Sequence, residues 1–113
     1  MPRDPRAYLW DALNAADAIA AFTHGEERED FEKDLLLRSA VERQFQIVGE
    51  ELNQLSRHAP DLAQQIPDLP RIVAFRNILV HAYAAVDNDT VRQAVQAPLP
   101  LLQKTLRRLL DEG

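Results

Sequence analysis

One short stretch of the chain holds four residues suited to chemistry among mostly aliphatic neighbours. They are Arg76, Asn77, His81 and Tyr83. An imidazole can accept or donate a proton near neutral pH. A guanidinium can hold a phosphate through two hydrogen bonds while it stabilises developing negative charge. These residue types therefore predict a site that binds a phosphate group and transfers protons.

A helix is expected to carry this stretch and to divide its residues between two sides. At about 100° per residue, the core face would hold Ile72, Phe75, Ile78, Leu79 and Ala82. Arg76, Asn77 and His81 share another side, although Arg76 and His81 lie about 140° apart. To meet at one small ligand they need the length of the Arg side chain, a helix that ends before His81, or a second copy of the chain.

The composition predicts one all-α domain spanning residues 1–113. A chain of 113 residues with 46% hydrophobic residues can form one core, and only three of its residues are Gly. There is no Cys, so neither a disulfide framework nor thiolate chemistry is expected. The N-terminus lacks the apolar run of a signal peptide, and no stretch is apolar for long enough to cross a membrane. We therefore expect a cytoplasmic protein without a membrane contact.

The charge pattern bears on the partners that the chain could bind. A net charge of −5 argues against broad, charge-driven binding of nucleic acid, which requires many Lys and Arg residues. The acidity is concentrated between Glu26 and Asp34, whereas Arg57, Arg71 and Arg76 make the middle of the chain more basic. A local site for a phosphate remains compatible with this asymmetry.

The hydrophobic periodicity predicts a four-helix up-and-down bundle with a short additional helix. The first helix should span residues 5–23, following the N-cap Asp4 and ending before Gly25. Further helices are expected at about 27–57, 68 or 69 to 83–85, and 90–97, with one turn at 61–65 and a last segment restarting at 98–100.

The second helix has two features with consequences for assembly and for the site. At a length of roughly 45 Å it should leave an apolar flank uncovered, which predicts a homodimer. Gly49 within it predicts a close helix contact, because Gly costs about 1 kcal/mol relative to Ala in a helix. Glu50 and Glu51 point about 100° apart and cannot chelate one ion together. We expect Glu50 to pair with Arg76, and Glu51 to be solvated.

Several common kinds of catalytic site are missing from the sequence. It contains no Gly-rich phosphate loop, no His-Glu-x-x-His motif and no Asp-rich calcium loop. His24, His58 and His81 are far apart, and none has a second ligand at helical spacing. We therefore expect neither a metal nor a cofactor.

The spacing Arg76-x4-His81-x-Tyr83 resembles the signature of the HEPN superfamily, and in particular of the HepT-like toxin family. The resemblance covers nearly the whole chain. Residues 41–52 are similar to the family's second helix, residues 66–67 precede the signature helix, and residues 86–87 follow it. Two departures are Asp68, where a Trp is common, and Ala74, where Gly is frequent. Both bear on packing more than on catalysis.

The resemblance implies a HEPN-like fold and a metal-independent endoribonuclease toxin that acts as a homodimer on tRNA or mRNA. The Arg and His of the two chains would face one another in a cleft at the two-fold axis. The adjacent 2′-OH of RNA supplies the nucleophile, so no metal-bound water is needed. We expect His81 to act as general base or acid, Arg76 to bind the scissile phosphate, Asn77 to orient one of them, and Glu50 to support Arg76.

Tyr83 has a separate role in the family that the chain resembles. The resemblance implies that its hydroxyl accepts AMP from a minimal nucleotidyltransferase antitoxin of the MntA type. A bulky anionic adduct beside Arg76 would block a phosphate cleft by charge and by volume. Without that partner, Tyr83 could simply be an aromatic residue at the edge of the core with its hydroxyl in water.

Other interpretations remain open at this point. The chain could be a non-catalytic HEPN module that binds nucleotides or RNA, or a helical scaffold that binds a protein partner. The stretch could also be structural, with Arg76 and Asn77 tying the helix to Glu50 and His81 capping the helix end.

Overall fold

The computed structural model describes residues 3–81 and 88–112, and within these ranges every regular element is a helix. This confirms the predicted all-α class. The described residues form seven helical segments, where five were expected. They are α1 (Pro5–Thr23), α2 (Arg28–Lys33), α3 (Leu35–His58), α4 (Pro60–Ala63), α5 (Leu69–His81), α6 (Asn88–Gln96) and α7 (Pro98–Glu112).

The first helix has the ends that its flanking residues predict. The Asp4 side chain accepts a hydrogen bond of 2.9 Å from the backbone N–H of Arg6, and Pro5 occupies the first turn. Pro is well suited to this place because its missing N–H would have no partner inside the helix. After Thr23 the chain turns at Gly25, whose φ of +77° is easily adopted only by Gly.

The prediction of one long second helix is wrong, because this helix is interrupted at Asp34. Asp34 has an extended backbone (φ −107°, ψ 94°), and its carboxylate accepts a hydrogen bond of 3.0 Å from the backbone N–H of Leu37. A carboxylate that caps the following turn competes with continuation of the helix. The remaining α3 has 24 residues, or about 36 Å, so the homodimer prediction loses the length on which it was based.

The break at Asp34 also changes which leucines reach the core. Leu35 is 67% exposed and Leu36 is 80% exposed, whereas Leu37 is partly buried. Upstream of the break, Phe31 in α2 is buried. The α2–α3 corner therefore turns two large apolar side chains toward solvent.

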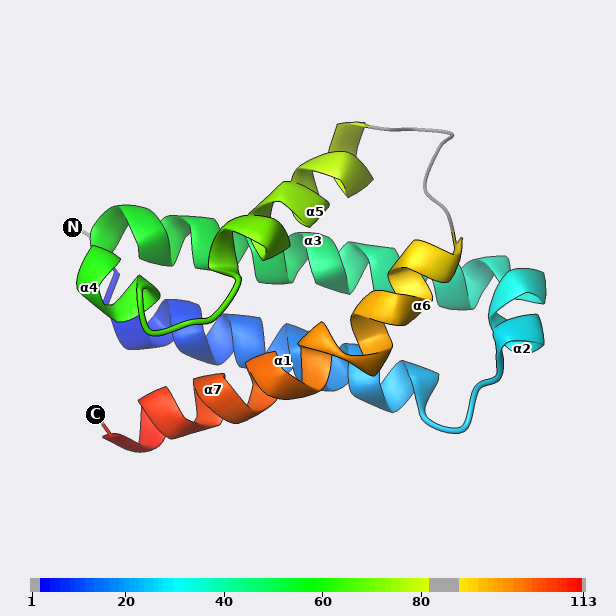
Figure 1. The fold of residues 1–113 in the computed structure, drawn as a ribbon, viewed down its shortest axis with the longest axis horizontal. Coiled ribbons are helices and arrows are strands. Elements are labelled where there is room, and N and C mark those ends of the chain that lie inside the picture. The colour runs from blue at the N-terminus through cyan, green and yellow to red at the C-terminus, as the bar shows by residue number, and fades with distance from the viewer. Residues whose placement is uncertain (1–2, 82–87, 113) are drawn as a thin grey trace.

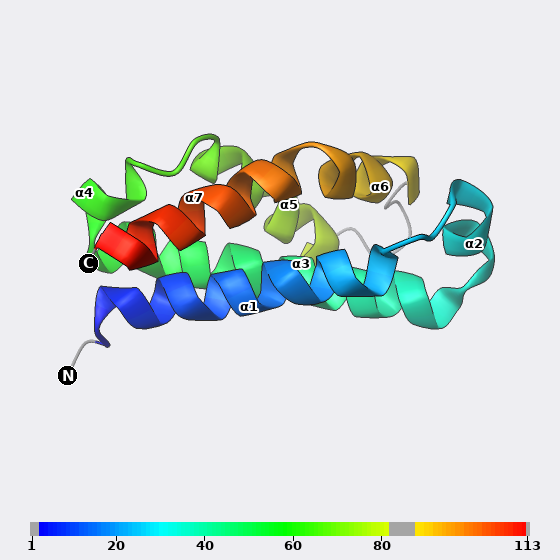
Figure 2. The same ribbon diagram turned by 90° about the horizontal axis from the view of Figure 1, so that it is seen from below.

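The helices run alternately up and down the bundle (Figure 1). α1 and α3 lie side by side and antiparallel, α7 packs on α1, and α5 crosses α3 (Figures 1 and 2). α6 and α7 form a bent pair that returns along the bundle, with the bend at Pro98. The largest fully buried side chains are Leu9, Ile19, Val41, Val48, Leu52, Leu55, Val91 and Leu106. The four-helix core is thus made by α1, α3, α5 and the α6–α7 pair.

α5 is the least buried long helix of this core. Its buried side chains are Leu69 and Leu79, while Phe75 is only partly buried. Ile78 was expected in the core and is 52% exposed, so that prediction is wrong. The reason is that α5 packs mainly against α3, and no other helix of the described chain contacts it as extensively. The predicted end of this helix at residues 83–85 lies outside the described residues.

Among the described residues, no helix combines the length and the apolar character needed to cross a membrane.

Candidate active site

The side chain of Arg76 lies where α5 crosses α3. Its Nη1 donates a hydrogen bond of 2.9 Å to Oδ1 of Asn77, and its Nη2 lies 3.6 Å from Oε1 of Glu50 on α3. The Arg76 side chain is 28% exposed and that of Glu50 is 38% exposed. The structure therefore brings together three of the predicted site residues, and the expected ion pair between Glu50 and Arg76 is present.

Gly49 makes this arrangement possible. A Cβ atom at position 49 would lie 2.2 Å from Cβ and 2.6 Å from Cγ of Arg76. These distances are far below a van der Waals contact, so any side chain at position 49 would push α5 away. The close helix contact predicted from this Gly is confirmed, and the residue that it admits is Arg76.

A second guanidinium approaches Glu50 from within α3. Nη1 of Arg43 lies 3.7 Å from Oε1 of Glu50 and 3.3 Å from Oε1 of Gln46. Arg43 was not among the residues predicted for the site, although its spacing of two helical turns from Glu50 could have indicated it. Two guanidinium groups thus share one carboxylate, which leaves a net positive charge beside α5. Because all three groups are partly exposed, their ion pairs contribute little to stability.

One donor of Arg76 has no partner. Its Nε is buried and makes no hydrogen bond to any described atom. A buried donor without an acceptor costs about 1–3 kcal/mol, so the guanidinium is not placed to satisfy all of its hydrogen bonds within the fold. Nη1 of Arg6, whose Nη2 donates to the Leu110 carbonyl, also lacks a partner among the described atoms, so the state of Nε alone does not mark Arg76 as functional.

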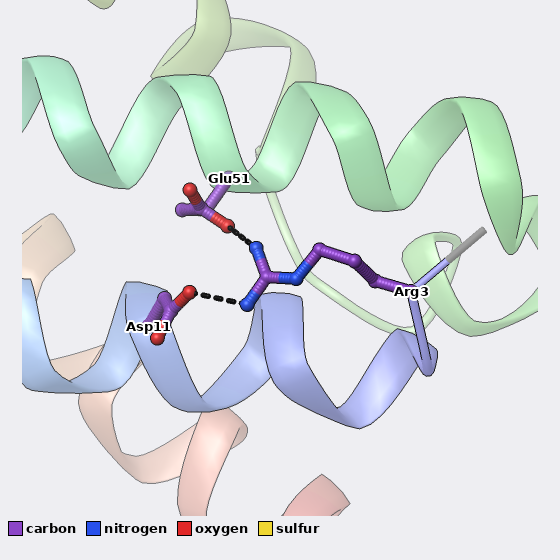
Figure 3. A network of polar contacts seen from close by, with 3 residues as sticks. All are labelled: Arg3, Asp11 and Glu51. Carbon is purple, nitrogen blue, oxygen red and sulfur yellow. Dashed lines mark hydrogen bonds and ion pairs between the residues drawn. The ribbon is translucent and has the colours of Figure 1, made fainter. Parts of the chain in front are cut away.

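Glu51 faces a different helix from Glu50, as the angle between consecutive helical residues requires. It was expected to be solvated, and this is wrong. Arg3 reaches across from the start of α1, with Nη1 lying 3.3 Å from Oε2 of Glu51 and Nη2 lying 2.7 Å from Oδ2 of Asp11 (Figure 3). The pKa of Glu51 is raised, first by burial and then by the charge of Asp11. This network fixes α1 against α3 and does not include Arg76.

The remaining predicted site residues lie beyond these contacts. His81 is the last residue of α5, while its side chain and all of Tyr83 lie outside the described part of the chain. His58 is away from the site, since its ring stacks on that of Tyr8 with centroids 5.8 Å apart. Within residues 3–81 and 88–112, no group of three His, Cys, Asp or Glu side chains could hold a metal ion.

Comparison with known proteins places most of the chain in one family model. The model described as "Ribonuclease HepT-like" matches residues 12–109. The "Probable ribonuclease HepT" of Thermococcus cleftensis is 31% identical over 112 residues, which cover 96% of this chain and 98% of that protein. A "Putative RNase" of Methanocaldococcus jannaschii is 30% identical over 104 residues, covering 90% of this chain and 93% of the relative. No solved structure gives a significant match.

Proposed function

The chain belongs to the HepT-like ribonuclease family, and from this premise we propose that it is a metal-independent endoribonuclease whose active site contains Arg76, Asn77 and His81. The names of its relatives support ribonuclease activity. The proposal depends most on the guanidinium of Arg76, which is partly exposed and is held by Asn77 and Glu50.

The proposed reaction uses a nucleophile that RNA itself provides. The 2′-oxygen attacks the neighbouring phosphorus, the bond from phosphorus to the 5′-oxygen breaks, and a 2′,3′-cyclic phosphate remains. His81 removes the proton from the 2′-OH or supplies one to the departing 5′-oxygen. Arg76 binds the non-bridging oxygens and stabilises the charge that builds on them.

Glu50 and Asn77 hold the guanidinium in place for this role. Glu50 fixes Nη2 from α3, and the Asn77 carbonyl oxygen accepts from Nη1 on the same helix. Because Arg43 also approaches Glu50, the cluster keeps a net positive charge that attracts a phosphodiester. Glu50 thus positions Arg76 without itself touching the substrate.

A homodimer would complete this site. Ala74, Asn77 and Ile78 are exposed on α5, and their spacing marks one face of a helix, on which His81 is the next position. A second copy that covers this face would bury Ile78 and bring the Arg and His of both chains to one axis. The angle of about 140° between Arg76 and His81 on one helix then presents no obstacle.

A partner protein would control the ribonuclease activity. A minimal nucleotidyltransferase antitoxin would transfer AMP to the hydroxyl of Tyr83, as the family resemblance implies. Tyr83 follows Arg76 by seven positions, which is about two helical turns and returns to nearly the same side if the helix continues. An adenylyl group there would place negative charge and bulk in the path of the RNA.

The growth of cells that express the chain tests the proposed toxin activity. We expect the wild-type chain to arrest growth and Arg76→Ala to relieve the arrest. Arg108→Ala is a matched control, because Arg108 is a half-exposed Arg in an ion pair with Glu112 on α7. Equal arrest by wild type and Arg76→Ala at equal protein level would refute the assigned site.

A further inference from the structure

A cavity of about 410 Å³ lies between α3, α5, α6 and α7. Its lining is mostly apolar and includes Phe45 on α3, Phe75 on α5 and Leu102 on α7. The two Phe rings meet edge to face, with centroids 5.3 Å apart. This volume falls in the range of sites for small molecules, which are usually apolar with a few polar groups that fix orientation.

Two charged side chains at the start of α5 also line the cavity. They are Asp68 and Arg71, both exposed. Neither side chain has a hydrogen-bond or ion-pair partner among the described residues, although one helical turn separates them. Asp68 has a φ of +60°, in the left-handed region that Asp adopts more readily than most residues other than Gly.

Two residues that line the cavity directly precede, in the sequence, Arg76 and the Gly49 against which Arg76 packs. Phe75 lines it and is followed directly by Arg76, while Val48 lines it and is followed by Gly49, over which Arg76 packs. The cavity and the side chain of Arg76 thus both lie at the crossing of α3 and α5. A flexible RNA strand can place a base in the cavity and a neighbouring phosphate at Arg76.

We propose that this cavity binds a guanine base of the RNA substrate, an inference that rests on the proposed ribonuclease function. Single-stranded RNA is commonly recognised through unstacked bases that contact aromatic side chains and hydrogen-bond along their edges. The Phe rings and leucines would contact the faces of the purine. Arg71 would donate to O6 and N7, and the Asp68 carboxylate would accept from N1–H and the 2-amino group.

The other bases do not satisfy both charged groups. Adenine has a 6-amino donor where guanine has O6, so it places one donor against the guanidinium. Cytosine and uracil have a single ring and fill less of the space between the helices. The combination of one free carboxylate and one free guanidinium therefore favours guanine.

Nucleotide binding tests this inference without relying on cleavage. Isothermal titration of the full chain with GMP, AMP, CMP and UMP should show the highest affinity for GMP. Arg71→Ala and Asp68→Asn should each reduce that affinity by roughly 5- to 100-fold. Both side chains are exposed, so these variants should fold, which a thermal melt will verify.

A cavity-filling variant gives an independent test. Ala94 lines the cavity from α6, so Ala94→Leu should abolish the GMP preference, whereas Ala21→Leu on the exposed side of α1 should leave it unchanged. Equal affinity for all four nucleotides, or GMP binding unaffected by Ala94→Leu, would overturn the guanine site even if the chain cleaves RNA. GMP binding that is lost in Arg71→Ala, Asp68→Asn and Ala94→Leu but kept in Ala21→Leu would support the site even if no RNA is cleaved.

Discussion

Gly49 on α3 lies directly against the side chain of Arg76 on α5, and a Cβ atom at position 49 would overlap Cβ and Cγ of that Arg. The closest approach of the two helices therefore coincides with the residue that we assign to the phosphate. Both the helix crossing and the placement of the guanidinium depend on the absence of a side chain at Gly49.

The variant Gly49→Ala should separate α5 from α3. We expect a loss of about 1–3 kcal/mol in the free energy of unfolding, which is typical of overpacking, together with slower RNA cleavage. Urea denaturation and a cleavage assay measure the two effects. Ser39→Ala on the exposed side of α3 is the control and should change stability by less than about 0.5 kcal/mol. A Gly49→Ala protein as stable and active as wild type would show that the crossing tolerates a side chain.

The variant Glu50→Gln should affect cleavage more than stability. The ion pair with Arg76 is partly exposed, so its loss should cost no more than about 1 kcal/mol. A displaced guanidinium should lower the cleavage rate by roughly tenfold or more. Glu112→Gln removes a comparable ion pair on α7 and should leave the rate unchanged. Equal rates for Glu50→Gln and Glu112→Gln would remove Glu50 from the site.

The cap at Asp34 predicts different results for two substitutions. Asp34→Ala should destabilise the chain by about 1 kcal/mol, because the backbone N–H of Leu37 loses its acceptor. Asp34→Asn should be nearly neutral, since Asn caps helices as well as Asp does. Chemical denaturation of the two variants measures the difference. Equal stability of the Ala and Asn variants would show that the α2–α3 break does not depend on the cap.

The raised pKa of Glu51 predicts that the free energy of unfolding depends on pH. Its pKa is raised above the ordinary 4.5 by burial and by Asp11, so the folded state holds its proton to higher pH than the unfolded state. The contribution of Glu51 is therefore most favourable below the ordinary pKa and is lost as pH rises through the raised value.

The variant Glu51→Gln isolates this effect. Its free energy of unfolding, relative to wild type, should increase as pH rises from about 4 to about 7. Denaturation of both proteins across this range measures the trend, with Glu112→Gln as the exposed control. A difference that is constant with pH, or that falls, would contradict the assigned direction.

Local signals in the sequence predicted those elements whose limits depend on local chemistry. Asp4 and Gly25 were sufficient to place both ends of α1, and the Glu50–Arg76 pairing followed from the two helices expected to pack. The break at Asp34 was missed because the leucines that follow it continue an apolar stripe, and periodicity alone does not reveal a competing cap.

Contacts that depend on tertiary arrangement were harder to predict. The bond between Arg3 and Glu51 requires the antiparallel register of α1 against α3, which no local pattern contains. The exposure of Ile78 follows from the packing of α5, which among the described helices contacts mainly α3, so its apolar character alone gave the wrong burial. The cavity beneath α5 likewise arises only where four helices meet.

Cleavage of a defined single-stranded RNA by the purified chain in excess EDTA is the sharpest test of the proposed active site. We predict that the wild type and Arg108→Ala cut the RNA at similar rates and leave 2′,3′-cyclic phosphate ends, whereas Arg76→Ala and His81→Ala are slower by about 100-fold or more. Cleavage by Arg76→Ala or His81→Ala at the wild-type rate, or no cleavage by the wild type in excess EDTA, would refute a metal-independent ribonuclease site at Arg76 and His81.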